Sequence, residues 1–219
     1  MHLSFIDTKE EILALKRKSK HVAPHLHNAL EIVCVTNGTL ELGVGQELYH
    51  MKKGDIGFVF PDIIHHYQIF SPGVNKAVYI ISPPFAIGKY AEIIQTMAPD
   101  YPIIKAEMVE PEVYRAINAI IDTDNMDIAV IQAYLQIVIA RCIGKLKLVE
   151  KGDVGSKDLV YQAVSYVSGN FRKNFSLDDM ARDLGVSKYV LSRTFSKTFH
   201  RNFNQYLNDA RLNYACHRL

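Results

Sequence analysis

The stretch Phe175-Ser-Leu-Asp-Asp-Met-Ala181-Arg-Asp-Leu-Gly185-Val-Ser187-Lys-Tyr-Val-Leu191 predicts two short helices joined by a tight turn. Ala181 is small enough to let a second helix cross close by, and Gly185 tolerates the positive φ that such a turn requires. Leu191 would close the core between the two helices, and Ser187 is placed to cap the second one. The same spacing also occurs in ordinary packed helix pairs, so the flanking residues decide between the two interpretations.

Positive charge is concentrated in the same part of the chain. Residues 157–219 contain ten Lys and Arg against five Asp and Glu, a net charge of +5, whereas the other 156 residues carry a net charge of −3. Contacts to nucleic-acid phosphates require such a concentration of basic side chains. A solvated basic surface without a partner is the alternative interpretation. Together, the charge pattern and the helix pair favour nucleic-acid binding.

The first third of the chain has the pattern of a β-domain. Short segments with alternating apolar residues are separated by turn signals, and Asn37-Gly38 is a strong hairpin turn between two of them. Many short strands at close, regular spacing indicate a sandwich or a small barrel. The predicted strands are residues 31–36, 39–44, 56–60, 67–70 and 76–81.

After residue 87 the apolar spacing changes to the 3.6-residue period of helices. Helices are expected around Ile93, over residues 113–121 and over residues 128–148, and the last two would form an antiparallel pair. Their apolar faces could pack on the barrel or on a second copy of the chain, and we favour a homodimer. Residues 151–156, with two glycines and alternating charge, are the expected linker.

These patterns predict an α+β protein in three parts: a barrel over residues 1–105, a helical dimerisation pair with its linker over 106–156, and a basic helical segment over 157–219. No signal peptide is visible, and the most apolar stretch, residues 128–143, is shorter than a membrane span. Three widely separated cysteines favour reduced thiols. We therefore expect a cytoplasmic protein that does not associate with a membrane.

Residues 158–219 resemble, without a gap, the DNA-binding domain of AraC-type bacterial transcription regulators. The resemblance rests on Ala181 and Gly185, on the run Leu191-Ser-Arg-Thr-Phe195 and on the spacing of Tyr206-Leu, Arg211-Leu and Ala215. Members of this family carry two helix-turn-helix motifs, and a second one does not follow within the 219 residues. We therefore expect this sequence to be a truncated form of a longer regulator.

The resemblance also implies which side chains read DNA. Base-edge contacts are expected from Lys188, Tyr189, Ser192 and Arg193, and phosphate contacts from Lys197, Arg201 and the backbone N–H of Ser187. Arg193 is the strongest candidate for a bidentate contact to guanine. Double-stranded promoter DNA is the implied partner, with RNA polymerase as a further candidate.

The N-terminal part resembles the cupin barrel that serves as the sensor in the same family. The run His25-Leu-His27-Asn-Ala-Leu-Glu31 resembles the first cupin motif, and Gly54-Asp55, Pro61 and His66 resemble much of the second. In metal-dependent cupins the equivalents of His25, His27, Glu31 and His66 hold one metal ion. His25, His27 and Glu31 are separated by even numbers of residues, so on a strand all three would project from the same face into the barrel. The alternative function is therefore a metal-dependent cupin enzyme, a dioxygenase or an isomerase.

The attached DNA-binding segment favours a regulator over an enzyme. We expect a small-molecule effector such as a sugar to bind inside the barrel, because convergent polar groups in an apolar barrel suit a polar metabolite. The expected effector contacts are His25, His27, Glu31, His66 and Tyr79, with Phe58 or Phe60 as an apolar wall. Neither a metal ion nor another cofactor is expected. Effector binding would shift the chain between two arrangements of different DNA affinity.

Overall fold

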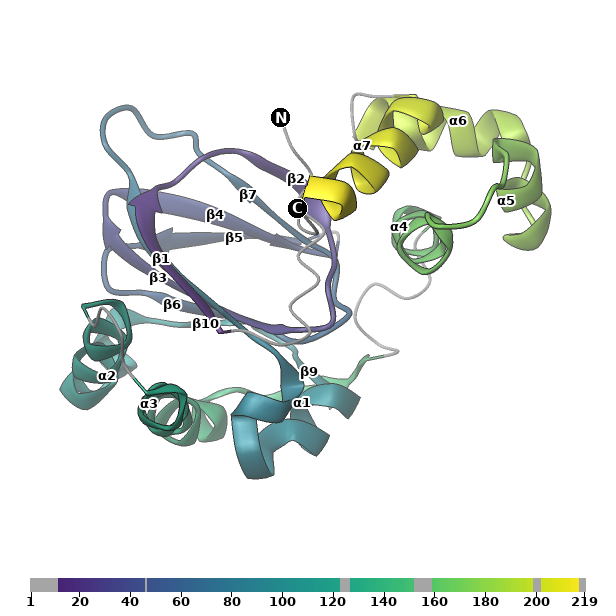
Figure 1. Cartoon of the computed structure of the whole chain (residues 1–219). Coiled ribbons are helices and arrows are strands. Elements are labelled where there is room, and N and C mark those ends of the chain that lie inside the picture. The colour runs from purple at the N-terminus through teal and green to yellow at the C-terminus, as the bar shows by residue number, and fades with distance from the viewer. Residues whose placement is uncertain (1–11, 46, 123–126, 152–158, 199–201, 217–219) are drawn as a thin grey trace.

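The computed structural model describes residues 12–45, 47–122, 127–151, 159–198 and 202–216 (Figure 1). Antiparallel strands dominate the N-terminal half, and helices follow. This mixed architecture confirms the predicted α+β class. The expected linker falls mostly on residues 152–158, which lie outside the described residues.

Two antiparallel sheets face each other and form the barrel. The first has the order β1 (Leu13–Lys18), β8 (Lys76–Ser82), β3 (Leu30–Asn37), β6 (Ile56–Val59) and β10 (Ile103–Ile104). The second has the order β2 (Val22–His25), β7 (His65–Gln68), β4 (Thr39–Val44) and β5 (Glu47–Lys52). Gly38 closes the β3–β4 turn with a φ of 71°, as the hairpin prediction requires. β7 begins at His65, two residues before the strand predicted over residues 67–70.

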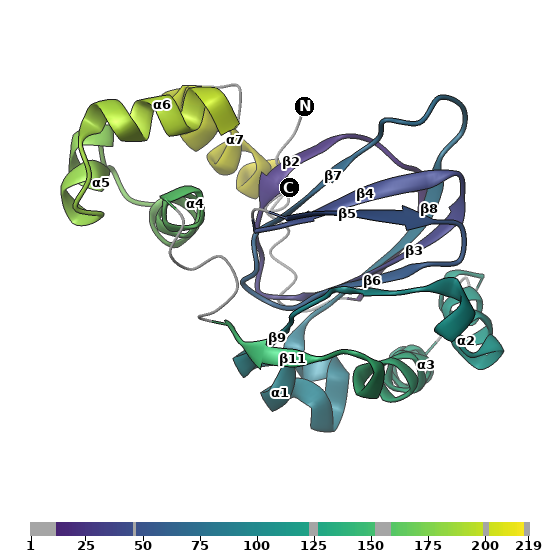
Figure 2. The same ribbon diagram turned by 180° about the vertical axis from the view of Figure 1, so that it is seen from behind.

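The middle helices cover one side of the barrel. The segment comprises η1 (Pro84–Tyr90), α1 (Ala91–Thr96), β9 (Met97–Pro99), η2 (Ala106–Met108), α2 (Pro111–Ile121), α3 (Ile128–Cys142), η3 (Ile143–Lys145) and β11 (Leu148–Glu150). Figure 2 shows α2 and α3 along the side of the barrel that carries β6. Their buried residues belong to the same apolar cluster as the strands. The predicted helix over residues 128–148 is too long. The observed helix α3 ends at Cys142, and Leu148 already belongs to β11, which pairs with β9.

α3 is strongly apolar and packs on one face only. Within the described residues, Ile128–Lys145 alone is long and apolar enough to cross a membrane by length and composition, a test that core helices also pass. Leu135, Val138 and Ile139 are buried in the core. Ile128 and Val130 remain 49% and 42% exposed. α3 thus buries one face against the barrel and leaves apolar side chains at its start exposed.

The C-terminal helices form a second core of their own. They are α4 (Leu159–Asn170), α5 (Leu177–Asp183), α6 (Lys188–Thr198) and α7 (Phe203–Cys216). Gly185, with a φ of 67°, turns the chain between α5 and α6, while Ala181 and Leu191 are buried between the helices as predicted. Of the described residues of the barrel, Leu26 and Ile64 are buried in this core. Figure 1 shows α7 ending beside β2, at the end of the barrel nearest these helices.

Candidate functional site

Four buried side chains meet inside the barrel. His25, His27, Glu31 and His65 each offer one nitrogen or oxygen atom, and these atoms all lie within 4.8 Å of one another. Glu31 stands on β3 of the first sheet, whereas His25 and His65 are directly paired on β2 and β7 of the second. His27 follows β2 in the connection to β3. The cluster therefore joins the two sheets across the interior.

Glu31 is the hydrogen-bonding centre of the cluster. Its Oε2 atom lies 3.0 Å from His27 Nε2 and 3.1 Å from His65 Nε2, and the Tyr67 hydroxyl donates to its Oε1 atom at 2.8 Å. Burial alone would raise the pKa of Glu31, but the hydrogen bonds with the two histidines hold this pKa well below its ordinary value. Burial, followed by the nearby Glu31 charge, raises the pKa of Tyr67 well above its ordinary value. Glu31 is accordingly a carboxylate and Tyr67 a neutral donor.

The two histidines nearest Glu31 have unusual hydrogen-bonding needs. His65 Nδ1 lies 3.0 Å from the Ile63 carbonyl oxygen, so both His65 nitrogens face acceptors. A neutral His65 has one N–H and can donate to only one of these two acceptors. His27 Nδ1 is buried without a hydrogen-bond partner among the described residues, and leaving such an atom unpaired costs about 1–3 kcal/mol. A proton or a cation within the cluster would satisfy the His65 lone pair.

Strand alternation decides which histidine joins the cluster, and it corrects the expectation for His66. Successive residues of a strand point to opposite faces, so His65 and Tyr67 face inward and His66 faces outward. The His66 ring occupies the space where a side chain on Gly43 would stand. Burial, followed by the nearby His65 and His21, lowers the pKa of His66 to about 4. His65, which the sequence interpretation missed, takes the place expected for His66.

The other expected effector contacts divide between the two faces of the first sheet. Tyr79 lies inside with the cluster: its ring centroid is 5.4 Å from that of Tyr67, and its hydroxyl donates to Ser19 Oγ at 3.1 Å. Phe58 pairs with Ile32 and therefore shares the face opposite to Glu31. The structure thus separates Phe58 from the cluster. Phe60 is buried just beyond the end of β6.

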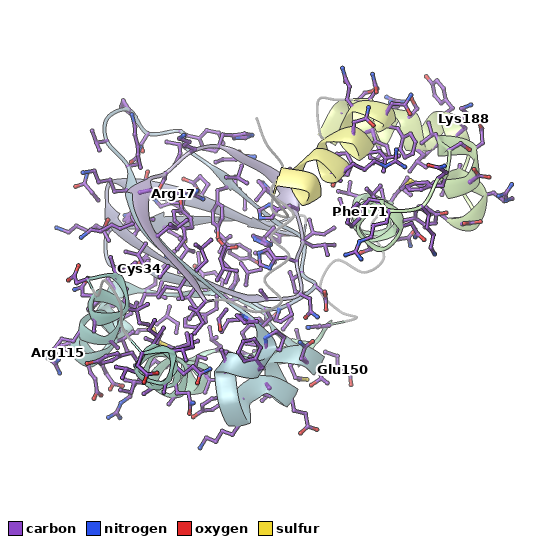
Figure 3. The ribbon with its side chains drawn as sticks, viewed as in Figure 1. Arg17, Cys34, Arg115, Glu150, Phe171 and Lys188 are labelled. Carbon is purple, nitrogen blue, oxygen red and sulfur yellow. The ribbon has the colours of Figure 1, made fainter. Side chains whose placement is uncertain are left out.

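Both ends of α6 carry polar groups that face solvent. Ser187 caps the helix by accepting a hydrogen bond from the Val190 backbone N–H at 3.2 Å. The exposed side chains of the helix include those of Lys188, Tyr189, Ser192, Arg193 and Lys197. Figure 3 shows Lys188 at the end of α6 remote from the barrel. Its ammonium group lies 2.6 Å from an Asp178 carboxylate oxygen on α5. Arg201, the remaining expected contact, lies outside the described residues.

Comparisons with known proteins agree with this architecture. The model of a family described as AraC-like ligand binding domain matches residues 11–134. The structure is similar to that of an apo variant of ToxT from Vibrio cholerae, at 12% identity and a TM-score of 0.52, over 98% of this chain and 83% of that chain. A second ToxT structure from the same organism has 10% identity and a TM-score of 0.50, over 94% and 82% of the two chains.

A third similar structure is the AraC-like transcriptional activator CuxR, at 12% identity and a TM-score of 0.47, over 93% of this chain and 76% of that chain. A comparison with curated protein sequences found no match.

Proposed function

Because the chain belongs to the family of AraC-like ligand-binding domains, we propose that it is a cytoplasmic, ligand-responsive transcription regulator whose C-terminal helices bind double-stranded promoter DNA. The observation that carries DNA binding is the composition of α6. This helix buries Leu191 and Phe195 in the C-terminal core and presents Lys188, Ser192 and Arg193 to solvent. A helix anchored on one face, with basic and hydroxyl side chains on the other, suits the major groove.

The exposed groups of α6 have different proposed roles. Arg193 would read guanine through its planar, two-pronged guanidinium, while Lys197 in the last turn would contact a phosphate. Lys188 pairs with Asp178, and such an exposed pair is weak enough for DNA to displace it. Ser187, at the helix start, offers a backbone N–H to a phosphate. RNA polymerase is a further proposed partner.

The ligand site is proposed to be the cluster around Glu31. A ligand there must be small and polar, because the surrounding barrel is apolar and the four side chains of the cluster are buried. A sugar-like metabolite or an ion would meet this requirement. The basic, solvent-facing side chains of α6 in the same chain favour a sensor over an enzyme.

Two apolar residues connect the ligand site to the DNA-binding helices. Leu26 lies between His25 and His27 in sequence, and Ile64 precedes His65. Both are buried in the core that α4, α5, α6 and α7 form. A ligand that moves the histidines would also move these contacts. The ligand would thereby favour one placement of α6 over another. The size of this shift depends on the ratio of the ligand's affinities for the two states.

The uncovered face of α3 is the proposed homodimer interface. Val130 is exposed there, and Ala129, Ala133 and Ala140 line a shallow groove between α3 and η1. Small residues let a second helix approach closely, and a second copy would bury the exposed Val130 side chain. A second copy of α3 fits such a face, since an isologous contact needs one self-complementary patch.

Selection from a random duplex library would test the proposed function. The purified chain should enrich duplexes that share a short motif, and Arg193→Ala should enrich the same pool poorly. Recovery of unselected sequences by both proteins would contradict sequence-specific DNA binding.

A further inference from the structure

We infer that Val190 on α6 contacts the methyl group of a thymine in the major groove, and that this contact helps to set the DNA sequence that the chain selects. The inference rests on the proposed function, because it requires α6 to lie in the groove. Of the described residues of the C-terminal helices, Tyr189 and Val190 are the large apolar side chains left exposed, at 75% and 46%. The Val190 side chain therefore gains little from the fold and has apolar surface to offer a partner.

Val190 shares a side of α6 with the basic groups that are proposed to contact DNA. An α-helix has 3.6 residues per turn, so Val190 is a neighbour of Arg193, three residues later, and lies on the same face as Lys197, seven residues later. The buried side chains of α6 are turned towards the C-terminal core. Val190 also belongs to the first turns of the helix, and the N-terminal residues of a recognition helix are those that contact base edges.

The backbone of Val190 is held in place while its side chain remains in solvent. Its N–H donates to the Ser187 hydroxyl at 3.2 Å, and its carbonyl accepts from the Thr194 hydroxyl at 3.1 Å. Figure 3 shows Lys188, two residues earlier, at the end of α6 remote from the barrel. A β-branched side chain has one strongly preferred rotamer in a helix, so Val190 loses little rotamer entropy when a partner covers it.

The major groove offers such a side chain one matching partner. Thymine is the base that presents a methyl group there, whereas the other bases present hydrogen-bonding atoms that valine cannot pair. Side chains three residues apart on a helix have Cβ atoms about 5–6 Å apart, and successive base pairs are about 3.4 Å apart. The thymine should therefore lie within about two base pairs of the guanine proposed for Arg193.

The test uses the full chain and the motif that it selects from the random duplex library. Each thymine of the motif is replaced in turn by deoxyuridine, which lacks only the methyl group, and affinity is measured by fluorescence anisotropy. The wild type should lose about fourfold in affinity at one thymine near the guanine, as expected for the burial of one methyl group. Val190→Ala should bind the thymine and uracil duplexes equally at that position.

Val74→Ala is the matched control, because Val74 is a similarly exposed valine, at 50%, on the connection between β7 and β8. This variant should keep the wild-type ratio of thymine to uracil affinity at every position. Val190→Ala should fold normally, since alanine is a better helix former than valine, and circular dichroism checks this.

Three results would overturn the inference: a selected motif without a thymine near the guanine, a wild type that binds thymine and uracil equally, or a Val190→Ala variant that keeps the wild-type ratio. In each of them sequence-specific DNA binding persists, so the proposed function is not affected. A wild-type chain that selects no motif would instead overturn the proposed function, and the role of Val190 with it.

Discussion

At the scale of single residues, Arg193 and Lys197 on α6 should have separable effects on DNA. Arg193→Ala should relax sequence preference at one position by about 1–3 kcal/mol, because it removes a bidentate base contact. Lys197→Ala should weaken binding to all duplexes alike. It should also reduce the slope of log affinity against log salt concentration by about the amount of one phosphate contact. Competition binding with matched and mutated duplexes measures both effects. The reverse pattern would show that the proposed groove contacts are wrongly assigned.

Adjacent residues also show where sequence interpretation stops. The sequence interpretation placed His25, His27 and Glu31 on one strand, whereas the structure places His25 on β2, Glu31 on β3 and His27 in the connection between them, so the three meet because the two sheets face each other. The sequence alone could not decide whether His65 or His66 faces inward. That choice depends on where β7 begins and on how it pairs with β2. Tyr67 went unnoticed for the same reason. Phe58 was assigned to the barrel interior without knowledge of the register between β3 and β6. That register pairs Phe58 with Ile32, on the face opposite to Glu31.

At the scale of elements, the contact between the barrel and the C-terminal helices should depend on Leu26. This side chain is buried in the C-terminal core, so Leu26→Ala should lower the free energy of unfolding by about 2–5 kcal/mol. Hydrogen exchange should show the loss of protection mainly in α4 and α7. Leu48→Ala on β5 is the control, because Leu48 is 45% exposed. Equal protection of the C-terminal helices in both variants would contradict a coupling role for Leu26.

The start of α5 should depend on ionised Asp179. The Ser176 hydroxyl and backbone N–H donate to this carboxylate, and Arg182 adds a further hydrogen bond. They lower the pKa of Asp179 to about 2, from an ordinary value near 4. A lowered pKa stabilises the folded state above the ordinary value, and this contribution is lost as the pH falls towards 2.

Asp179→Ala should therefore melt at a lower temperature than the wild type at neutral pH. The difference between the two melting temperatures should shrink as the pH falls from 4 to 2. A difference that stays constant over this range would show that the carboxylate does not stabilise α5.

Elements with strong local signals were predictable, and those that depend on distant pairing were not. The hairpin of β3 and β4 has Asn37-Gly38 at its turn, and α5 and α6 have Ser176, Gly185 and Ser187 at their ends. β5 carries exposed charged residues and was missed. β11 was read as part of a helix, because its strand character comes from pairing with β9, about fifty residues earlier.

At the scale of the whole molecule, α3 should hold two copies of the chain together. Ile128→Glu combined with Val130→Glu places charges on the two exposed apolar side chains at the start of α3, and the desolvation of those charges would oppose association. Sedimentation should show a dimer for the wild type and a monomer for the double variant. Leu48→Glu, which is exposed on β5, should stay dimeric. A wild-type chain that remains monomeric at high concentration would contradict the proposed interface.

The central claim is that the C-terminal helices bind DNA while the barrel binds a ligand in the same chain. The most direct test is a fluorescence anisotropy titration of the full chain with a selected duplex over a series of salt concentrations. The affinity should fall steeply and linearly on logarithmic axes as salt rises, with a smaller slope for Lys197→Ala. Undetectable binding at low salt, or binding that is independent of salt in both proteins, would contradict the account.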